Sequence, residues 1–227
     1  TLMFNKAQFK IGFPYRKTQA ALFYDIAVCR SDMNFEVDDM LNMISLFGTK
    51  TAYPHEYKMP GDAVIRERPY LVYFPTASVD YKCWSSDNFS NLISKMSASY
   101  PQYDHIILKG VQQWEIDIAD DIIQSQQCEN IHALSTKTIE EATALIKGAT
   151  MVVSNDTGIR HLAIVSNIPT VGILISVQPF RYWPRSDIHD VVLLNDEGQP
   201  SVNQALSVCE NLLQNIQPKH EKPGTRK

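Results

Sequence analysis

The chain has 227 residues, of which 44% are hydrophobic and 20% are charged, and this is the composition of an ordinary globular protein. The length suits one large domain, or one domain with part of another, and it is sufficient to bury a real core. The formal net charge of −4 gives no global reason to expect a nucleic-acid-binding protein, although local basic residues can still serve an anionic ligand.

The four cysteines are scattered along the sequence at Cys29, Cys83, Cys128 and Cys209. Because they form no CxxC pair, they argue against a zinc site and against a disulfide framework. Reduced thiols of this kind are typical of a cytosolic protein. No apolar run approaches the roughly 18 residues of a membrane-spanning helix.

The first 50 residues have a mixed pattern. Residues 10–13 predict a short strand, and residues 37–47 have the spacing of an amphipathic helix that stops at Gly48. Residues 51–69 contain three prolines, one glycine and many charges, so they predict a linker with room for one short strand.

From Tyr70 onward, short apolar runs alternate with segments of helical spacing. Strands are expected at residues 70–74, 105–108, 131–134, 151–153, 170–175 and, more weakly, 191–194. Helices are expected near residues 85–96, 116–123, 138–146, 157–166 and 202–216. Apolar strands that alternate with helices indicate an α/β fold, a parallel sheet covered by helices on both faces. This domain is expected over residues 70–217, followed by a disordered tail at 218–227.

The most informative stretch is the turn Ser-Asn-Asp-Thr-Gly at residues 154–158, between a buried strand and a helix. A helix N-terminus has unpaired N–H groups and a partial positive charge, so it can bind a phosphate. Asp156 is expected to be the N-cap, Gly158 allows close approach of a ligand, and His161 shares a helix face with Thr157 and Gly158. The structural alternatives are that Asp156 only caps the helix and that His161 only packs or faces solvent.

Two further loops follow strands at the same edge of the expected sheet, where ligands bind in such folds. Lys82 and Ser78 lie in the first loop and could contact a phosphate, or Lys82 could be a solvated surface residue. Glu115 follows Gly110 in the second loop and could accept the hydroxyls of a ribose, or it could complement the dipole of its helix. The aromatic and basic segment 178–184 could stack on a base or sugar, or simply pack.

Residues 154–163, Ser-Asn-Asp-Thr-Gly-Ile-Arg-His-Leu-Ala, and the following 167–171, Asn-Ile-Pro-Thr-Val, resemble the signature of glycosyltransferase family 9, the ADP-heptose:lipopolysaccharide heptosyltransferases. Residues 82–85, Lys-Cys-Trp-Ser, are similar to the Lys-x-Trp-Pro element of that family, with Ser85 in place of proline. The resemblance covers about residues 70 to 175.

The resemblance implies a GT-B architecture, in which two Rossmann-like domains face each other and the C-terminal one binds the nucleotide sugar. Lys82, Thr157, Gly158 and His161 match the family positions around the diphosphate, with Asp156 in the same turn. Ser78 and Glu115 match a hydroxyl position and a ribose-binding acid less closely. Residues 1–50 would be the end of an incomplete, acceptor-side domain.

The implied reaction is an inverting transfer of a sugar, with heptose favoured, to lipopolysaccharide or a related glycan or lipid-linked acceptor. The donor would be a nucleotide diphosphate sugar such as ADP-heptose, with no tightly bound cofactor and no metal. The catalytic base is expected in a missing N-terminal part. Four aspartates near the start are candidates by type only, with no motif to support them: Asp25, Asp32, Asp38 and Asp39.

The implied location is cytoplasmic, with the inner face of the bacterial inner membrane left open. An alternative function is a nucleotide-sugar-binding module without activity of its own. A Rossmann oxidoreductase is disfavoured because the sequence has no GxGxxG fingerprint.

Overall fold

The computed structural model describes residues 6–14, 18–50, 57–175, 179–196 and 198–216. The chain divides into two compact units. The smaller unit combines residues 1–55 with 178–183, and the larger unit combines residues 56–177 with 184–227. Both the expected linker residues 51–56 and the expected tail at 218–227 lie outside the described residues.

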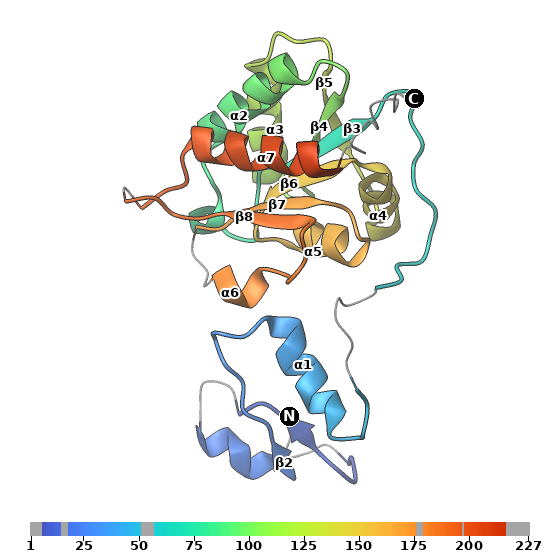
Figure 1. Cartoon of the computed structure of the whole chain (residues 1–227), viewed down its shortest axis with the longest axis vertical. Helices are drawn as coiled ribbons and strands as arrows, with labels where there is room; N and C mark the ends of the chain where they lie inside the picture. Colours follow the sequence, from blue (N-terminus) through green and yellow to red (C-terminus); the bar gives the residue numbers. More distant parts are fainter. Residues whose placement is uncertain (1–5, 15–17, 51–56, 176–178, 197, 217–227) are drawn as a thin grey trace, which may run out of the picture. The chain divides into compact units, whose positions relative to one another are not determined.

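The larger unit is built on a six-stranded parallel sheet (Figure 1). Its strand order is β5-β4-β3-β6-β7-β8, and every neighbouring pair is parallel. At the centre, Val72 of β3 pairs with Ile106 of β4 and with Val152 of β6. The bounds are β3 (Tyr70–Phe74), β4 (Asp104–Lys109), β5 (Ile131–Ser135), β6 (Met151–Asn155), β7 (Thr170–Ile173) and β8 (His189–Val192). The predicted parallel α/β sheet is therefore confirmed.

Helices cover both faces of this sheet, as Figure 1 shows. One face packs against α2 (Ser86–Ser99), α3 (Gln113–Gln124) and α7 (Val202–Ile216), and the other packs against α4 (Ile139–Gly148) and α5 (Gly158–Val165). Side chains of a strand alternate between the two faces, so Leu71 and Tyr73 enter the first layer and Val72 enters the second. Helices are needed on both faces because these strands carry apolar side chains on both sides, and each side must be shielded from water.

Several strand boundaries differ from the sequence-based expectation by one or two residues, most clearly in β7 and β8. β7 ends at Ile173 instead of residue 175, and β8 begins at His189 instead of residue 191. In β8 the first residue is polar but buried, because His189 Nδ1 lies 3.1 Å from Thr170 Oγ1 in a hydrogen bond across the two strands. Strands of this kind are predicted from runs of apolar residues, so a buried, hydrogen-bonded polar pair is not recognised from the sequence.

The expected short strand of the linker does not form in the described residues 57–69. This segment bonds to a helix instead of a strand: the Val64 N–H donates to the Ala144 carbonyl oxygen at 2.9 Å. Lys147 donates to the carbonyl oxygens of Met59 and Gly61. This segment makes scattered contacts to α4 and has no neighbouring strand with which its backbone could form a row of hydrogen bonds.

The smaller unit contains two short parallel strands, one 3₁₀ helix and two α-helices in its described residues. The bounds are β1 (Ile11–Gly12), β2 (Ile26–Ala27), the 3₁₀ helix η2 (Thr18–Phe23), α1 (Glu36–Ser45) and the one-turn helix α6 (Pro179–Tyr182). The predicted amphipathic helix is thus present as α1, and Gly48 follows it with a φ of 81°, a conformation that favours glycine.

Arg181 ties α6 to the rest of the smaller unit. Its Nε donates to Glu36 Oε2 at 2.8 Å and its Nη1 donates to Asp32 Oδ1 at 2.9 Å. Arg30 also pairs with Glu36. Because only 12% of the Arg181 side chain is exposed, packing is the alternative that the structure favours for this part of segment 178–184.

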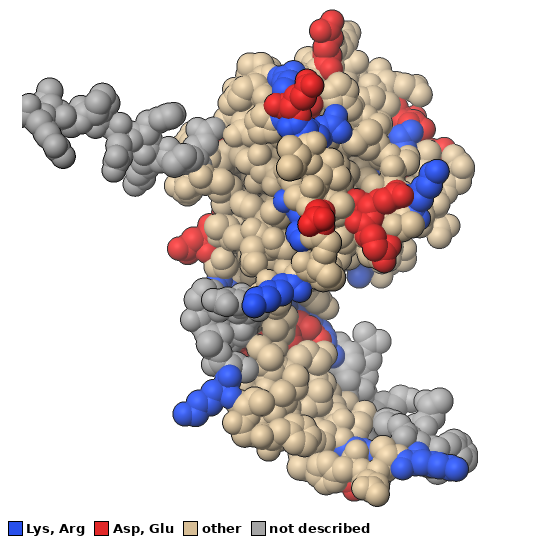
Figure 2. Space-filling model, turned by 90° about the vertical axis from the view of Figure 1, so that its right-hand side faces the viewer, with Lys and Arg blue, Asp and Glu red and all other residues tan. Residues whose placement is uncertain are grey.

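The surface of the larger unit mixes charges of both signs on the face drawn in Figure 2, where blue and red side chains are interspersed among uncharged ones. This pattern agrees with the small net charge of the chain. Among the helices in the described part of the chain, none combines the length and apolar character needed to cross a membrane.

Candidate functional site

The site is placed by a reversal in the strand order. The chain moves outward from β3 to β4 and β5, and then returns to the other side of β3 to add β6, β7 and β8. In open parallel sheets, ligands bind beyond the carboxyl ends of the strands at such a reversal. The loops that follow β3 and β6 meet there, and they carry most of the predicted site residues.

The turn after β6 leads into α5, which begins at Gly158. Its N-cap is Thr157, with φ −142° and ψ 169°, and the Thr157 side chain accepts from the Arg160 N–H. The prediction that Asp156 is the N-cap is therefore wrong by one residue, because the extended backbone that an N-cap requires occurs at Thr157.

The start of α5 is open. The N–H groups of Gly158 and Ile159 make no hydrogen bond within the described part of the chain. A Cβ built on Gly158 would meet no neighbouring atom within 4 Å. Free first-turn N–H groups with space in front of them form the anion site that the sequence predicts.

Asp156 lies between two basic side chains instead of capping the helix. Its Oδ1 is 3.6 Å from His161 Nε2 and 3.8 Å from Arg160 Nη1. Removal of water by the surrounding protein lowers the pKa of His161 below its usual 6.5, while Asp156 opposes this shift and Arg160 adds to it. His161 keeps 47% of its side chain exposed, so its ring can still meet a ligand.

Arg160 is a site feature that sequence reasoning missed. Its side chain is fully buried beneath the turn, and a Cβ on Gly172 would come within 2.3 Å of Arg160 Nε. Burial lowers the pKa of Arg160 to about 10, which leaves the guanidinium charged at neutral pH. No pattern signal could have found it, because an arginine within an amphipathic helix is normally expected to face solvent.

The loop after β3 carries Ser78 and Lys82. Ser78 is exposed, and Lys82 is half-buried at the end of the 3₁₀ helix η3 (Asp80–Lys82). Trp84 closes the loop: its ring is buried and its Nε1–H donates to the Pro200 carbonyl oxygen at 2.8 Å. Ser85 then caps α2 by accepting from the Asn88 N–H, a role that suits the serine found there in place of proline.

Asn155 joins the loop after β3 to the turn after β6, and it too was missed. The Trp84 N–H donates to Asn155 Oδ1 at 2.9 Å, and Asn155 Nδ2 donates to the Pro75 carbonyl oxygen at 2.7 Å. The asparagine is fully buried at the end of β6, next to Asp156. Its partners are 71 and 80 residues away in sequence, so no local motif reveals them.

Glu115 is buried at the start of α3, where its carboxylate takes part in three hydrogen bonds. Oε2 accepts from the N–H groups of Val111 and Gln112 at 3.0 and 2.9 Å, and Oε1 accepts from the Thr76 hydroxyl at 3.2 Å. The carboxylate packs so closely on Gly110 that a Cβ there would lie 2.4 Å from its Cδ. The structural alternative for Glu115 is thus realised, while its contact with a ribose stays a prediction.

A cavity of about 360 Å³ opens beside Glu115. Apolar side chains from three elements line it, namely Phe74, Leu108 and Ile159. Polar groups at its edge come from Lys109 and from the start of α4, including Lys137 and Thr138. A mostly apolar cavity with a few polar groups suits a flat heterocycle attached to a polar sugar.

The structure thus brings Ser78, Lys82, Asp156, Thr157, Gly158 and His161 to the loops at one reversal of the sheet, with Glu115 on the neighbouring loop. The four candidate aspartates for a base belong to the smaller unit. Among them, Asp25 accepts from the Lys10 N–H, Asp32 pairs with Arg181, and Asp39 accepts from Asn34.

Comparisons with known proteins agree with the resemblance seen in the sequence. Residues 1–210 match the family model described as glycosyltransferase family 9 (heptosyltransferase). The lipopolysaccharide core heptosyltransferase OpsX of Haemophilus influenzae is 22% identical over 212 residues, which cover 86% of this chain and 60% of that protein. Lipopolysaccharide heptosyltransferase 3 of Escherichia coli is 30% identical over 119 residues, which cover 52% of this chain and 34% of that protein.

Solved structures show the same fold. The E. coli heptosyltransferase WaaC with ADP-2-deoxy-2-fluoro heptose superposes with a TM-score of 0.68 at 18% identity, covering 91% of this chain and 65% of that one. A glycosyl transferase family 9 protein from Veillonella parvula gives a TM-score of 0.74 at 14% identity, covering 92% and 68%. The matched part of this chain therefore spans from about a third to 60% of the curated relatives and about two thirds of these structures.

Proposed function

Because the chain belongs to glycosyltransferase family 9 (heptosyltransferase), we propose that it is the donor-binding part of an enzyme that moves a sugar from a nucleotide diphosphate sugar to a glycan acceptor. The larger unit is the donor domain and residues 1–50 are the end of the acceptor-side domain. The single observation that carries this proposal is the open start of α5, where two first-turn N–H groups are free beside His161 and the Lys82 loop.

The donor's diphosphate sits against the start of α5. The N–H groups of Gly158 and Ile159 and the hydroxyl of Thr157 donate to it, Lys82 adds positive charge, and the His161 ring offers a further N–H donor. Ser78 supplies a further hydroxyl. Asp156 holds His161 toward this site through their 3.6 Å contact.

The nucleoside lies in the 360 Å³ cavity, with its base between apolar side chains such as Phe74 and Ile159 and its ribose toward Glu115. Adenine is the base that we propose, supported by two structures of one relative, E. coli WaaC, which contain ADP and an ADP-heptose analogue. Heptose is accordingly the sugar that we propose for transfer.

In the reaction, an acceptor hydroxyl attacks the anomeric carbon from the face opposite the diphosphate and gives its proton to a carboxylate base of the acceptor-side domain, and the C–O bond to the diphosphate breaks with inversion. The departing diphosphate gains negative charge, which the α5 N–H groups, Lys82 and His161 stabilise. The acceptor is lipopolysaccharide or a related glycan or lipid-linked molecule, supported by the names of the curated relatives. A cytoplasmic location, where nucleotide sugars are used, follows from the same proposal. Membership of an enzyme family disfavours a binding module without activity.

The experiment that tests the proposal is calorimetric titration of this chain with ADP, UDP and GDP, and with AMP as the control. We expect ADP to bind more tightly than the other diphosphates and more tightly than AMP, because the α5 site contacts both phosphates. Equal affinity for ADP and AMP, or binding of neither, would contradict a diphosphate site at this turn. ADP-heptose is the next ligand to test if ADP is preferred.

A further inference from the structure

The buried amide of Asn155 stands at the junction of the two loops that form the proposed phosphate site. Asn155 is the last residue of β6 and directly precedes Asp156. Its side chain reaches across to the neighbouring strand connection, where it accepts from the Trp84 N–H and donates to the Pro75 carbonyl oxygen.

These two bonds close the loop at both ends. Pro75 is the first residue after β3, and Trp84 is the residue that precedes the cap of α2. The segment between them carries the exposed Ser78 and the half-buried Lys82, which lies two residues before Trp84. A loop whose two ends are fixed to one side chain has few conformations left to lose when a ligand binds.

Only an amide fits both partners. The Trp84 N–H needs an acceptor and the Pro75 carbonyl needs a donor, and both groups are buried with Asn155. Aspartate at this position would accept but not donate, and alanine or serine could not bridge the two groups. A side chain that only caps a helix or closes a turn would need a donor or an acceptor, but not both.

We propose that Asn155 is a positioning residue for donor binding: it fixes the Lys82 loop to the Asp156–Gly158 turn, so that the Lys82 ammonium and the α5 N–H groups act on the same diphosphate. This inference rests on the proposed function for its ligand, but the loop attachment itself can be tested without any ligand. It predicts that the contribution of Lys82 to binding depends on Asn155.

The first test measures the loop in the ligand-free protein. Trypsin cleaves after Lys82, and mass spectrometry can follow this cleavage together with cleavage after Lys95 within α2, which reports general unfolding. We expect Asn155→Ala to accelerate cleavage at Lys82 relative to Lys95 by about tenfold or more, because the loop loses both attachments. The milder Asn155→Ser gives the same comparison if the alanine variant folds poorly.

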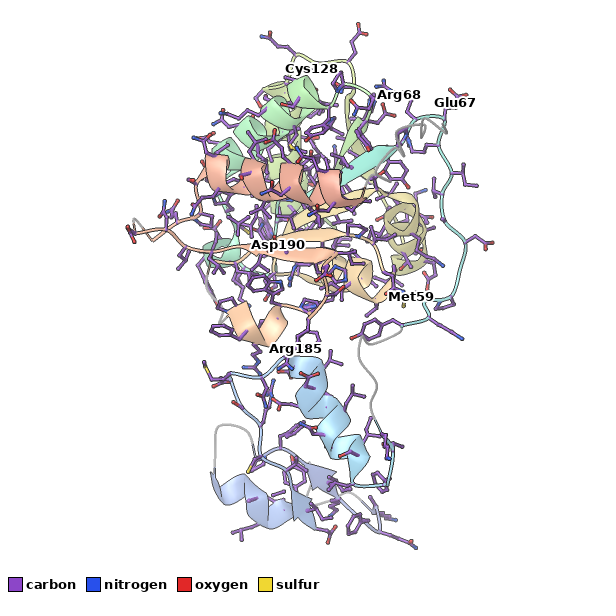
Figure 3. All side chains as sticks on the ribbon, viewed as in Figure 1. Met59, Glu67, Arg68, Cys128, Arg185 and Asp190 are labelled. Carbon is purple, nitrogen blue, oxygen red and sulfur yellow. The ribbon has the colours of Figure 1, made fainter. Side chains whose placement is uncertain are left out.

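The matched control is Asn130→Ala. Asn130 also bridges two segments: its Nδ2 donates to the Tyr103 carbonyl oxygen at 3.1 Å and its Oδ1 accepts from the Ser97 hydroxyl at 2.7 Å. Asn130 directly precedes β5 and lies at the amino edge of the sheet, opposite to the proposed site. It is close in sequence to Cys128, which is labelled in Figure 3. Asn130→Ala should leave the Lys82-to-Lys95 ratio at its original value. If Asn155→Ala also leaves this ratio unchanged, the positioning role is overturned.

The second test is a double-mutant cycle for ADP binding by calorimetry. We expect Lys82→Ala to weaken binding by about fivefold or more in the original chain, but by less than about twofold when Asn155 is alanine. Equal losses in the two backgrounds would show that Asn155 does not position Lys82. If the original chain does not bind ADP, the proposed function fails, and the trypsin ratio still decides whether Asn155 holds the loop.

Discussion

Lys82 and His161 bring two different nitrogen donors to the start of α5. The Lys82 ammonium is a point charge on a flexible stem in the loop after β3, whereas the His161 ring stands on the helix itself, 3.6 Å from Asp156. A diphosphate carries enough charge and oxygen atoms to engage both groups at once. Their separate removal therefore tests whether one ligand joins the two loops.

We predict that Lys82→Ala and His161→Ala each weaken ADP binding by about 1–3 kcal/mol, or roughly five- to 150-fold, since each variant loses a charge-assisted contact. Calorimetric titration measures the loss. Lys95→Ala on α2 and His132→Ala on β5 are the matched controls, and neither should change the affinity. Unchanged affinity in both site variants would remove the basis for a phosphate-binding turn.

Single residues also mark the limit of what the sequence reveals about the site. Short local motifs contain Thr157, Gly158, His161 and Lys82. The sequence alone could therefore identify these residues as site candidates, although it does not give their positions in three dimensions. Arg160 and Asn155 could not be identified in this way, because each is defined by burial and by partners that the fold brings from distant segments. A buried polar side chain is recognised only when its partners are known.

At the scale of elements, the α3 cap explains why Glu115 is buried. Gln112 and Glu115 form a capping box, and the Glu115 carboxylate also accepts from the Thr76 hydroxyl of the neighbouring loop. One carboxylate thus stabilises a helix start and fixes a loop. The negative charge at the start of the helix is favourable by itself.

We predict that Glu115→Gln lowers the free energy of unfolding by about 1–2 kcal/mol, because an amide cannot replace all three acceptor contacts of the carboxylate. Urea denaturation followed by circular dichroism measures this change. Glu141→Gln is the matched control, because Glu141 accepts from the Lys137 N–H at the start of α4 but is exposed. An equal loss in the two variants would contradict a special structural role for Glu115.

The same scale shows which elements the sequence can predict. The strands β3 to β6 contain short apolar runs, and the helices that follow them have regular spacing, so both were predicted within a few residues. β8 begins two residues before its predicted start because His189 is paired with Thr170. No linker strand forms in the described residues 57–69, where the Val64 N–H bonds to α4, a partner that the pattern of these residues does not show.

At the scale of the whole molecule, the chain enters the smaller unit twice. Residues 1–55 form most of it, and the one-turn helix α6 returns to it after β7 and is held through Arg181 by Glu36 and Asp32. The larger unit contains the donor site that we propose, and residues 1–50 remain, by proposal, the end of an acceptor-side domain. The sequence predicts a parallel α/β sheet for the larger unit but not the order of its strands, since sequence patterns do not show which strands are neighbours.

Two buried histidines make the stability of the larger unit depend on pH. His105 hydrogen-bonds to the Tyr73 hydroxyl and His189 to the Thr170 hydroxyl, and both side chains are buried. The pKa of each histidine is lowered from 6.5 to about 4, mainly by burial, and nearby Arg160 contributes to the shift of His189. In the unfolded chain both return to the ordinary value, so between pH 6.5 and 4 the unfolded state binds more protons than the folded state.

We therefore predict that the free energy of unfolding falls as the pH is lowered from 6.5 toward 4, by up to about 3 kcal/mol for each histidine, with no contribution from either group above pH 7. Urea denaturation at pH 7.0, 6.0 and 5.0 measures the slope. His105→Gln keeps a polar side chain that can bond to Tyr73 but does not titrate, so its slope should be clearly smaller than that of the original chain over this range. Carboxylates that titrate near pH 4 affect both proteins alike and cancel in the comparison, so parallel slopes would mean that the pKa of His105 is the same in the folded and the unfolded chain.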